Sequence, residues 1–179
     1  MLMGEPVTTA GTGAGRLTGP AGHPATGGIM SSTKSDAYEG FTAEERAAMK
    51  EHAQERKAAA RRGSPADKAA QAERDVLGKI AEMEGSDRVM AERVHAVVMA
   101  ASPALTARLW YGMPAYALDG KVLCFFQSAA KFKARYATLG FSDRANLDDG
   151  TMWAAGFALT DVTPQVEARI AALVQQAVR

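Results

Sequence analysis

The sequence predicts an α+β fold in which a helical hairpin precedes a small antiparallel sheet and a C-terminal helix closes the chain. Two patterns lead to this class. Apolar residues recur at helical spacing before residue 102 and again after residue 163. Between them, short segments rich in aromatic and β-branched residues alternate with glycine-bearing turns, which is typical of strands. A chain of 179 residues with a hydrophobic content of 47% is long enough for one domain with its own core.

The first 40 residues hold nine of the 17 glycines and three of the seven prolines. Such a segment has little apolar surface to bury, so packing would not offset the entropy lost on ordering it. We therefore expect residues 1–40 to form a disordered tail. Met30, which precedes the polar stretch SSTKSD, is a second candidate for the start of translation.

Residues 41–63 predict a charged helical arm that is exposed to solvent. Thr42 and Glu45 have the spacing of a capping box, and Gly63 supplies a stop. The apolar residues of this segment are mostly alanines, so the helix has little to pack with. The alternative is a dimerisation or nucleic-acid arm, although glutamates lie among its basic residues, which are Arg56, Lys57, Arg61 and Arg62.

A pair of helices is predicted next. Apolar residues at helical spacing mark the first helix, namely Val76, Leu77, Ile80 and Met83. After EGSD, a second apolar stripe consists of Val89, Met90, Val94, Val97 and Val98. Ser102-Pro103 ends the second helix, because the residue before proline is biased away from the helical region. The pair indicates an antiparallel hairpin that covers one face of a sheet.

The sheet is expected from four segments, RLWY, VLCFFQ, KFKARYATLGF and MWAAGFAL, which begin at residues 108, 122, 131 and 152. Asp119-Gly120 favours a hairpin between the first two. Both faces of residues 122–126 are apolar, so this strand is expected to be central and covered on both sides. Thr163-Pro164 begins the closing helix, with an N-cap followed by proline. The elements together predict an α+β domain over residues 73–179.

Net charge, cysteine content and the length of apolar runs argue against several classes of protein. A net charge of +1 argues against a charge-driven nucleic-acid binder. The one cysteine, Cys124, suits a reducing cytosol, and no apolar run reaches the roughly 18 residues that span a membrane. We therefore expect a cytoplasmic protein without a membrane partner. No catalytic motif is recognisable, and His95 and Cys124 lie in apolar segments typical of a core, so a non-enzymatic role is favoured.

The loop DRANLDDG brings together Asp143, Asp148 and Asp149. Turn and cap chemistry is the simpler interpretation of these carboxylates. A weak site for ferrous or another divalent cation is the alternative, because such ions take oxygen ligands. The spacing is not that of an EF-hand.

The segment KFKAR predicts a strand with Lys131, Lys133 and Arg135 on one face. One interpretation is an edge strand that lysines protect against self-pairing. The other is a face that binds a phosphate or carboxylate.

The stretch WYGMPAY carries the second candidate ligand site. Gly112 and Pro114 flank Met113, which predicts a turn or bulge that proline removes from the sheet ladder. Such a break would turn neighbouring side chains towards a cleft that is lined by Trp110, Tyr111, Met113, Pro114 and Tyr116. The alternative is a bulged strand whose aromatic side chains fill the core.

The same residues carry a family resemblance. WYGMPAY, the following GK at residues 120–121 and the strand CFF resemble the YdhG-like domain family of small bacterial proteins, over roughly residues 76–178. The resemblance implies a compact α+β fold and a non-enzymatic role. Some members of the family are described as frataxin-like iron chaperones, which implies ferrous iron as a cargo. The mixed charges of the helical arm and the basic strand depart from the acidic ridge expected of frataxin-type proteins, so no metal ligand is assigned.

Two functions follow as hypotheses. The first is an iron-chaperone-like protein that handles metal inside the cell. The second is a binding module for a small molecule, an anion or a protein partner, which uses the WYGMPAY residues and the basic segment. The sequence does not indicate an oligomeric state.

Overall fold

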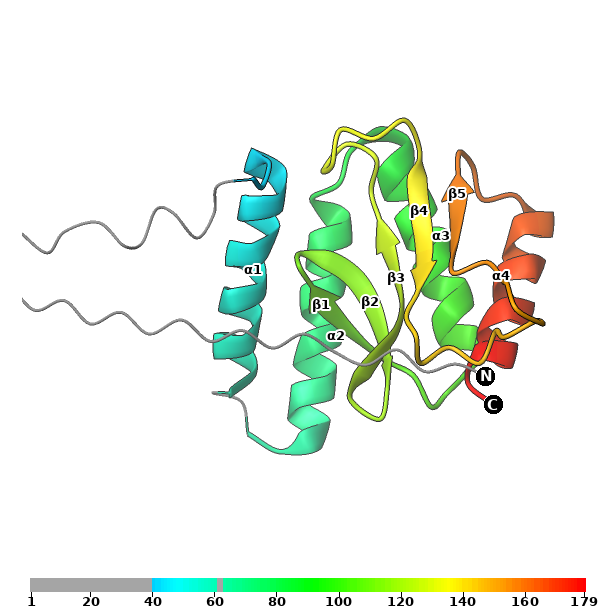
Figure 1. Cartoon of the computed structure of the whole chain (residues 1–179). Helices are drawn as coiled ribbons and strands as arrows, with labels where there is room; N and C mark the ends of the chain where they lie inside the picture. The colour runs from blue at the N-terminus through cyan, green and yellow to red at the C-terminus, as the bar shows by residue number, and fades with distance from the viewer. Residues whose placement is uncertain (1–39, 61–62) are drawn as a thin grey trace, which may run out of the picture. The chain divides into compact units, whose positions relative to one another are not determined.

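The computed structural model describes residues 40–60 and 63–179. Apart from Gly40, the predicted tail and the candidate start at Met30 lie outside the described residues, as do Arg61 and Arg62 of the predicted arm. The described residues form four helices and a five-stranded antiparallel sheet, which confirms the predicted α+β class (Figure 1).

The elements follow the predicted order. Three helices come first: α1 (Ala43–Ala60), α2 (Pro65–Ala81) and α3 (Gly85–Ala101). The strands are β1 (Thr106–Trp110), β2 (Met113–Leu118), β3 (Lys121–Gln127), β4 (Ala137–Phe141) and β5 (Gly156–Leu159). The closing helix is α4 (Pro164–Ala177). Within the described part of the chain, no helix has the length and apolar character needed to cross a membrane.

Local sequence signals set the helix ends. The capping box of α1 is confirmed, because Thr42 N–H donates to Glu45 at 2.8 Å and Glu45 N–H donates to the Thr42 hydroxyl at 3.1 Å. Thr163 caps α4 as predicted, since its hydroxyl accepts the N–H of Val166. Helix α3 ends at Ala101, directly before Ser102-Pro103. These ends depend on neighbours in the sequence, which is why the sequence alone could locate them.

The sheet is a meander in the order β1-β2-β3-β4-β5, so β3 is the central strand, as predicted. Asp119 and Gly120 form the predicted hairpin loop, and both have positive φ. The strand before this loop is β2, however, and not the predicted segment RLWY. On the β3–β4 pair, Phe125 lies opposite Gly140. A side chain at Gly140 would overlap the Phe125 ring, so the glycine makes room for this ring on the sheet.

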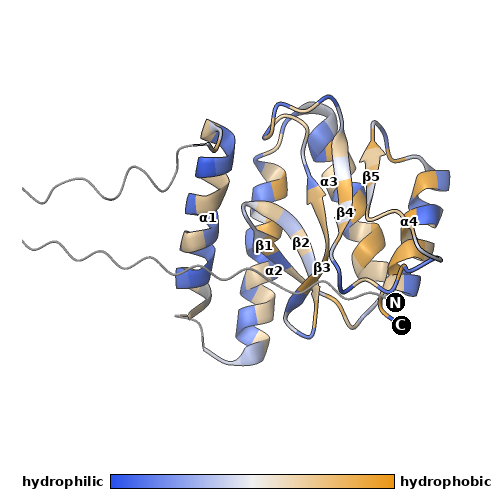
Figure 2. Ribbon diagram, in the orientation of Figure 1, coloured by the Kyte–Doolittle hydropathy of each residue, from blue (hydrophilic) through white to orange (hydrophobic). Residues whose placement is uncertain are grey.

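The core lies between the sheet and the helices α2, α3 and α4. In Figure 1, α2 and α3 lie behind the sheet and α4 lies beside β5. The predicted apolar stripes face this core, although Leu77 and Val89 lie exposed at their edges. The fully buried side chains include Val76, Val94, Val98, Tyr116, Leu123, Phe126 and Val174. Figure 2 shows the contrast with α1, on which hydrophilic residues predominate.

Two predictions about strands are wrong. The segment KFKAR is not part of a strand, because β4 begins only at Ala137. Residues 129–134 instead form a turn, in which Ala134 N–H donates to the carbonyl of Ala129 at 2.9 Å and Lys133 has a φ of 51°. Lys131, Lys133 and Arg135 therefore do not share a strand face.

The second correction concerns the stretch MPAYAL, at the start of which a turn or bulge was predicted around Met113 and Pro114. These residues form the strand β2, between β1 and β3. Pro114 pairs with Leu109 of β1, while the register with β3 begins only at Ala115. The missing N–H of Pro114 thus lies beyond the β2–β3 ladder and interrupts no pair in it. The turn lies one residue earlier than predicted, at Tyr111-Gly112.

Candidate ligand-binding site

The turn between β1 and β2 has an unusual backbone. Trp110 pairs with Met113, so the loop consists of Tyr111 and Gly112 only. Both residues are left-handed, with φ of 53° and 67°, as a type I′ turn requires. Glycine adopts this conformation easily, but tyrosine is strained there. Neighbouring groups must therefore hold Tyr111 in place.

The groups that hold this turn come from α1 and from the loop after β3. The Glu55 carboxylate accepts both N–H groups of the turn, from Tyr111 at 3.2 Å and from Gly112 at 2.6 Å. The His52 ring stacks on the Tyr111 ring, with their centroids 4.2 Å apart. Lys131 Nζ donates to the Tyr111 carbonyl at 2.8 Å. Two consecutive N–H groups that point at one carboxylate form an anion-binding concavity, which Glu55 fills.

Two further carboxylates of α1 face basic side chains. Glu51 forms ion pairs with Lys131 and with Lys79, the latter at 3.0 Å. Glu44 pairs with Lys133. Partial burial raises the pKa of Glu51, but hydrogen bonds from Lys131 and Lys79 outweigh it, so the net pKa is lowered. The helix predicted as an exposed arm thus contacts the β1–β2 turn and nearby lysines through its acidic residues, and no local pattern in the sequence indicates these contacts.

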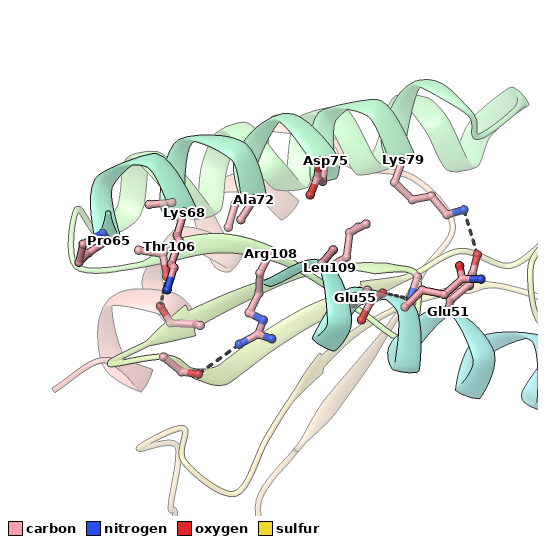
Figure 3. Close-up of a pocket in the computed structure, with 17 residues that line it drawn as sticks. Glu51, Glu55, Pro65, Lys68, Ala72, Asp75, Lys79, Thr106, Arg108 and Leu109 are labelled. Atoms are coloured by element: carbon pink, nitrogen blue, oxygen red, sulfur yellow. Dashed lines mark hydrogen bonds and ion pairs between the residues drawn. The ribbon is translucent and has the colours of Figure 1, made fainter. Parts of the chain in front are cut away.

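A cleft of about 630 Å³ lies between α1, α2 and β1. Figure 3 shows Pro65, Lys68, Ala72, Asp75 and Lys79 of α2 above it and Glu51 and Glu55 of α1 on another side. Small apolar side chains make up much of its wall, namely Ala58, Ala69, Ala72, Ala107 and Leu109. This volume falls within the range of roughly 300–1,000 Å³ that is common for small-molecule sites.

Two cationic groups in the cleft have few partners. The Arg108 guanidinium donates to the Gly120 carbonyl at 3.3 Å and forms no ion pair with the described residues. Lys68 is exposed and has no ion-pair partner within residues 40–60 and 63–179. Asp75 also lines the cleft and accepts a hydrogen bond from Gln71 at 2.8 Å. The cleft therefore combines an apolar wall with donors that suit a carboxylate or phosphate.

The structure disperses the site residues predicted from the sequence. Met113, Pro114 and Tyr116 are buried, so they do not form the predicted aromatic cleft. Trp110 and Tyr111 are partly exposed and contact each other edge to face. The basic residues also separate, because Lys131 contacts the turn, Lys133 pairs with α1 and Arg135 lies over the Tyr136 ring.

The buried titratable groups near β2 and β3 are protonated or neutral at pH 7. Burial raises the pKa of the Cys124 thiol to about 12 and raises the pKa of Tyr116 well above its usual value. Burial also lowers the pKa of His95, whose Nδ1 lies 3.5 Å from the Tyr116 hydroxyl. A thiol with so high a pKa is a poor nucleophile, which agrees with the core role predicted for Cys124.

Comparison with family models, with curated proteins and with solved structures found no match to this chain. The resemblance to the YdhG-like family therefore stays a prediction.

The acidic loop does not assemble a metal centre from the groups that the structure describes. Asp143, Asp148 and Asp149 are exposed. Within residues 40–60 and 63–179, no three His, Cys, Asp or Glu side chains are placed to hold one ion. The iron-chaperone hypothesis thus gains no ligand set from these residues.

Proposed function

We propose that this protein is a non-enzymatic binding module for a small amphipathic anion, which it holds in the cleft between α1, α2 and β1. The observation that carries the proposal is the composition of the cleft. An apolar wall of alanines and Leu109 lies beside Arg108 and Lys68, which have no ion-pair partners among the described residues. A ligand with a hydrocarbon body and one carboxylate or phosphate would satisfy both parts.

The wall sets the shape of the ligand. Its small side chains leave the space that a hydrocarbon chain would fill, and burying such a chain contributes about 25 cal/mol per Å² of apolar surface. The guanidinium of Arg108 offers a planar set of donors, which suits bidentate contact with an anion. The proposal therefore predicts that neither an uncharged analogue nor a bare anion binds as well as the amphipathic anion.

The test uses the full chain and three probes, octanoate, octyl phosphate and octanamide, measured by thermal shift and by calorimetric titration. Octanoate or octyl phosphate is expected to raise the melting temperature, while octanamide leaves it unchanged. The rise in melting temperature is expected to be smaller in Arg108→Gln and in Lys68→Gln. Lys121→Gln, which changes an exposed lysine outside the cleft, should keep the full rise. No shift with either anion would refute the proposal.

A second pair of variants tests the position of the ligand. Ala72→Leu places a larger side chain in the cleft, and Ala70→Leu makes the same change on an exposed part of α2 outside it. We expect loss of octanoate binding in the first and normal binding in the second. Equal affinities would place the ligand elsewhere.

The iron-chaperone role is a separate hypothesis, which rests on the resemblance to the YdhG-like family alone. Its test is an anaerobic calorimetric titration of ferrous iron into the full chain, with zinc for comparison. Saturable binding that prefers iron would support that role, and absence of heat would remove it.

A further inference from the structure

We propose that the surface under α1 is a docking site for an acidic helix of a partner protein, and that α1 occupies this site in the free chain. The α1-binding surface consists of the turn Tyr111-Gly112, together with Lys79, Lys131 and Lys133. This inference goes beyond the proposed small-molecule cleft, because it concerns a macromolecular partner and involves Lys131 and Lys133, which do not line the cleft; Lys79 and Gly112 belong to both.

The contacting residues of α1 form a single stripe. Glu44, Ala48, Glu51 and Glu55 are separated by four, three and four residues, which places them on one face of a helix. Each of the three carboxylates meets a complementary group: Lys133 for Glu44, Lys131 and Lys79 for Glu51, and the two turn N–H groups for Glu55. The surface thus recognises carboxylates at a defined helical spacing.

Two of the receiving lysines, Lys131 and Lys79, also have partners outside α1. Lys131 is anchored to the Tyr111 carbonyl, and its loop is fixed where Ala130 N–H donates to the buried Asp87 carboxylate at 2.8 Å. Lys79 also pairs with Glu82, which directly follows α2. The left-handed turn presents two adjacent N–H groups on the same side. Lys131 and Lys79 are therefore held in position independently of α1, which favours a helix that places a carboxylate between them.

The attachment of α1 has a weak apolar part. Among its described side chains only Ala48 is buried, with 4% of its surface exposed. The other contacts are the stacking of His52 on the Tyr111 ring and a set of ion pairs and hydrogen bonds that are partly open to solvent. Salt weakens these polar contacts. Because little hydrophobic surface holds α1, a partner helix that carries the same acidic stripe is expected to compete with it.

The experiment loosens α1 in the full chain and supplies a competing helix. The probe is a fluorescein-labelled peptide with the sequence of residues 41–60, and binding is measured by fluorescence anisotropy. The variant combines Glu44→Gln, Glu51→Gln and Glu55→Gln, which remove the three charges and keep the side-chain size. We expect this variant to bind the peptide at least about tenfold more tightly than the wild-type chain does. Binding should weaken with added salt and disappear for a peptide that carries the same three Gln substitutions.

Amide hydrogen exchange at Tyr111 and Gly112 reports whether α1 has left the surface. Faster exchange in the variant, reversed by the acidic peptide, supports the proposal. Faster exchange without peptide binding would overturn the proposal. Unchanged exchange would also overturn it, because the three carboxylates would then not be what holds α1. If the triple variant does not fold, Lys131→Gln in the wild-type chain gives the same test, with faster exchange at Tyr111 expected. Exchange of α1 between two copies, seen as a dimer in light scattering, would assign the site to a second copy and overturn the partner assignment.

The two proposals can fail separately. Ala72→Leu fills the cleft but leaves every group of the α1-binding surface unchanged. This variant is expected to lose octanoate and, in the background of the three Gln substitutions, to keep the acidic peptide. Loss of both ligands would show that one surface serves both.

Discussion

Gly112 N–H donates to the Glu55 carboxylate at 2.6 Å, across 57 residues of sequence. The Glu55 side chain is only 12% exposed, and it also accepts the N–H of Tyr111. A charged acceptor in a partly buried position forms stronger hydrogen bonds than a neutral one. This one carboxylate therefore links α1 to the first hairpin of the sheet.

Replacing Glu55 tests how much this link contributes. Glu55→Ala leaves the N–H groups of Tyr111 and Gly112 without their acceptor, and the strained tyrosine loses its support. We expect a loss of about 1–3 kcal/mol in the free energy of unfolding, measured by urea denaturation. Lys50→Ala, an exposed change on the same helix, should alter it by no more than about 0.5 kcal/mol. Equal values for the two variants would contradict the role of Glu55.

Two glycines should respond to alanine in opposite directions. Gly112 has a φ of 67°, and an added Cβ would overlap the Glu51 carboxylate and Lys131 Nζ. Gly112→Ala is therefore expected to lower the free energy of unfolding by about 1–3 kcal/mol. Gly78 lies within α2, where an added Cβ meets no atom within 4 Å. Gly78→Ala should raise it by about 0.5–1 kcal/mol. If Gly112→Ala raised the free energy of unfolding instead, the turn would have to adopt a different backbone conformation that accommodates alanine.

The packing of Phe125 on Gly140 predicts another matched pair. Gly140→Ala forces the Phe125 ring to move, and we expect a loss of about 1–3 kcal/mol. Gly156 lies opposite Gly140 on β5, and a Cβ there would meet Thr138 Cγ2 only at 3.8 Å. Gly156→Ala should therefore be tolerated. A double-mutant cycle with Phe125→Leu checks the cause, because the loss at Gly140 should shrink once the ring is absent.

The lowered pKa of Glu51 predicts how stability depends on pH. Its pKa in the folded chain lies below the ordinary value of 4.5, so Glu51 stabilises the folded state above pH 4.5 and loses this contribution as pH falls through its folded pKa. We expect the wild-type chain to be more stable than Glu51→Gln at neutral pH and the difference to vanish in acid. Urea denaturation of both chains over this range measures it. If the stability difference between the two chains grew in acid, the pKa of Glu51 would be raised in the folded chain and not lowered.

Local signals in the sequence predicted a large part of this fold. The capping box at Thr42, the break at Ser102-Pro103, the Asp119-Gly120 turn and the N-cap at Thr163 each depend on residues within a few positions of one another. The central place of β3 followed from its two apolar faces. The α+β class was therefore determined by the sequence alone.

The errors share a physical cause. The alternating pattern of KFKAR suits a strand, but residues 129–134 form a turn, in which Ala130 N–H donates to the carboxylate of Asp87 in α3. Pro114 suggested a break, but the place where the β2–β3 ladder begins lets it stay within a strand. In the first case a contact between residues 43 positions apart outweighs the local preference, and in the second the register of the sheet does.

The candidate sites were decided by the tertiary structure. The sequence singled out WYGMPAY and Lys131 but paired them with the wrong geometry, and it gave no sign that the glutamates of α1 would meet them. Glu55 and Gly112 are 57 residues apart, and Glu51 and Lys131 are 80 apart. A local pattern carries information about backbone conformation and about which face of an element is apolar. Which charges face each other is determined only when the packed elements bring distant side chains within hydrogen-bonding distance.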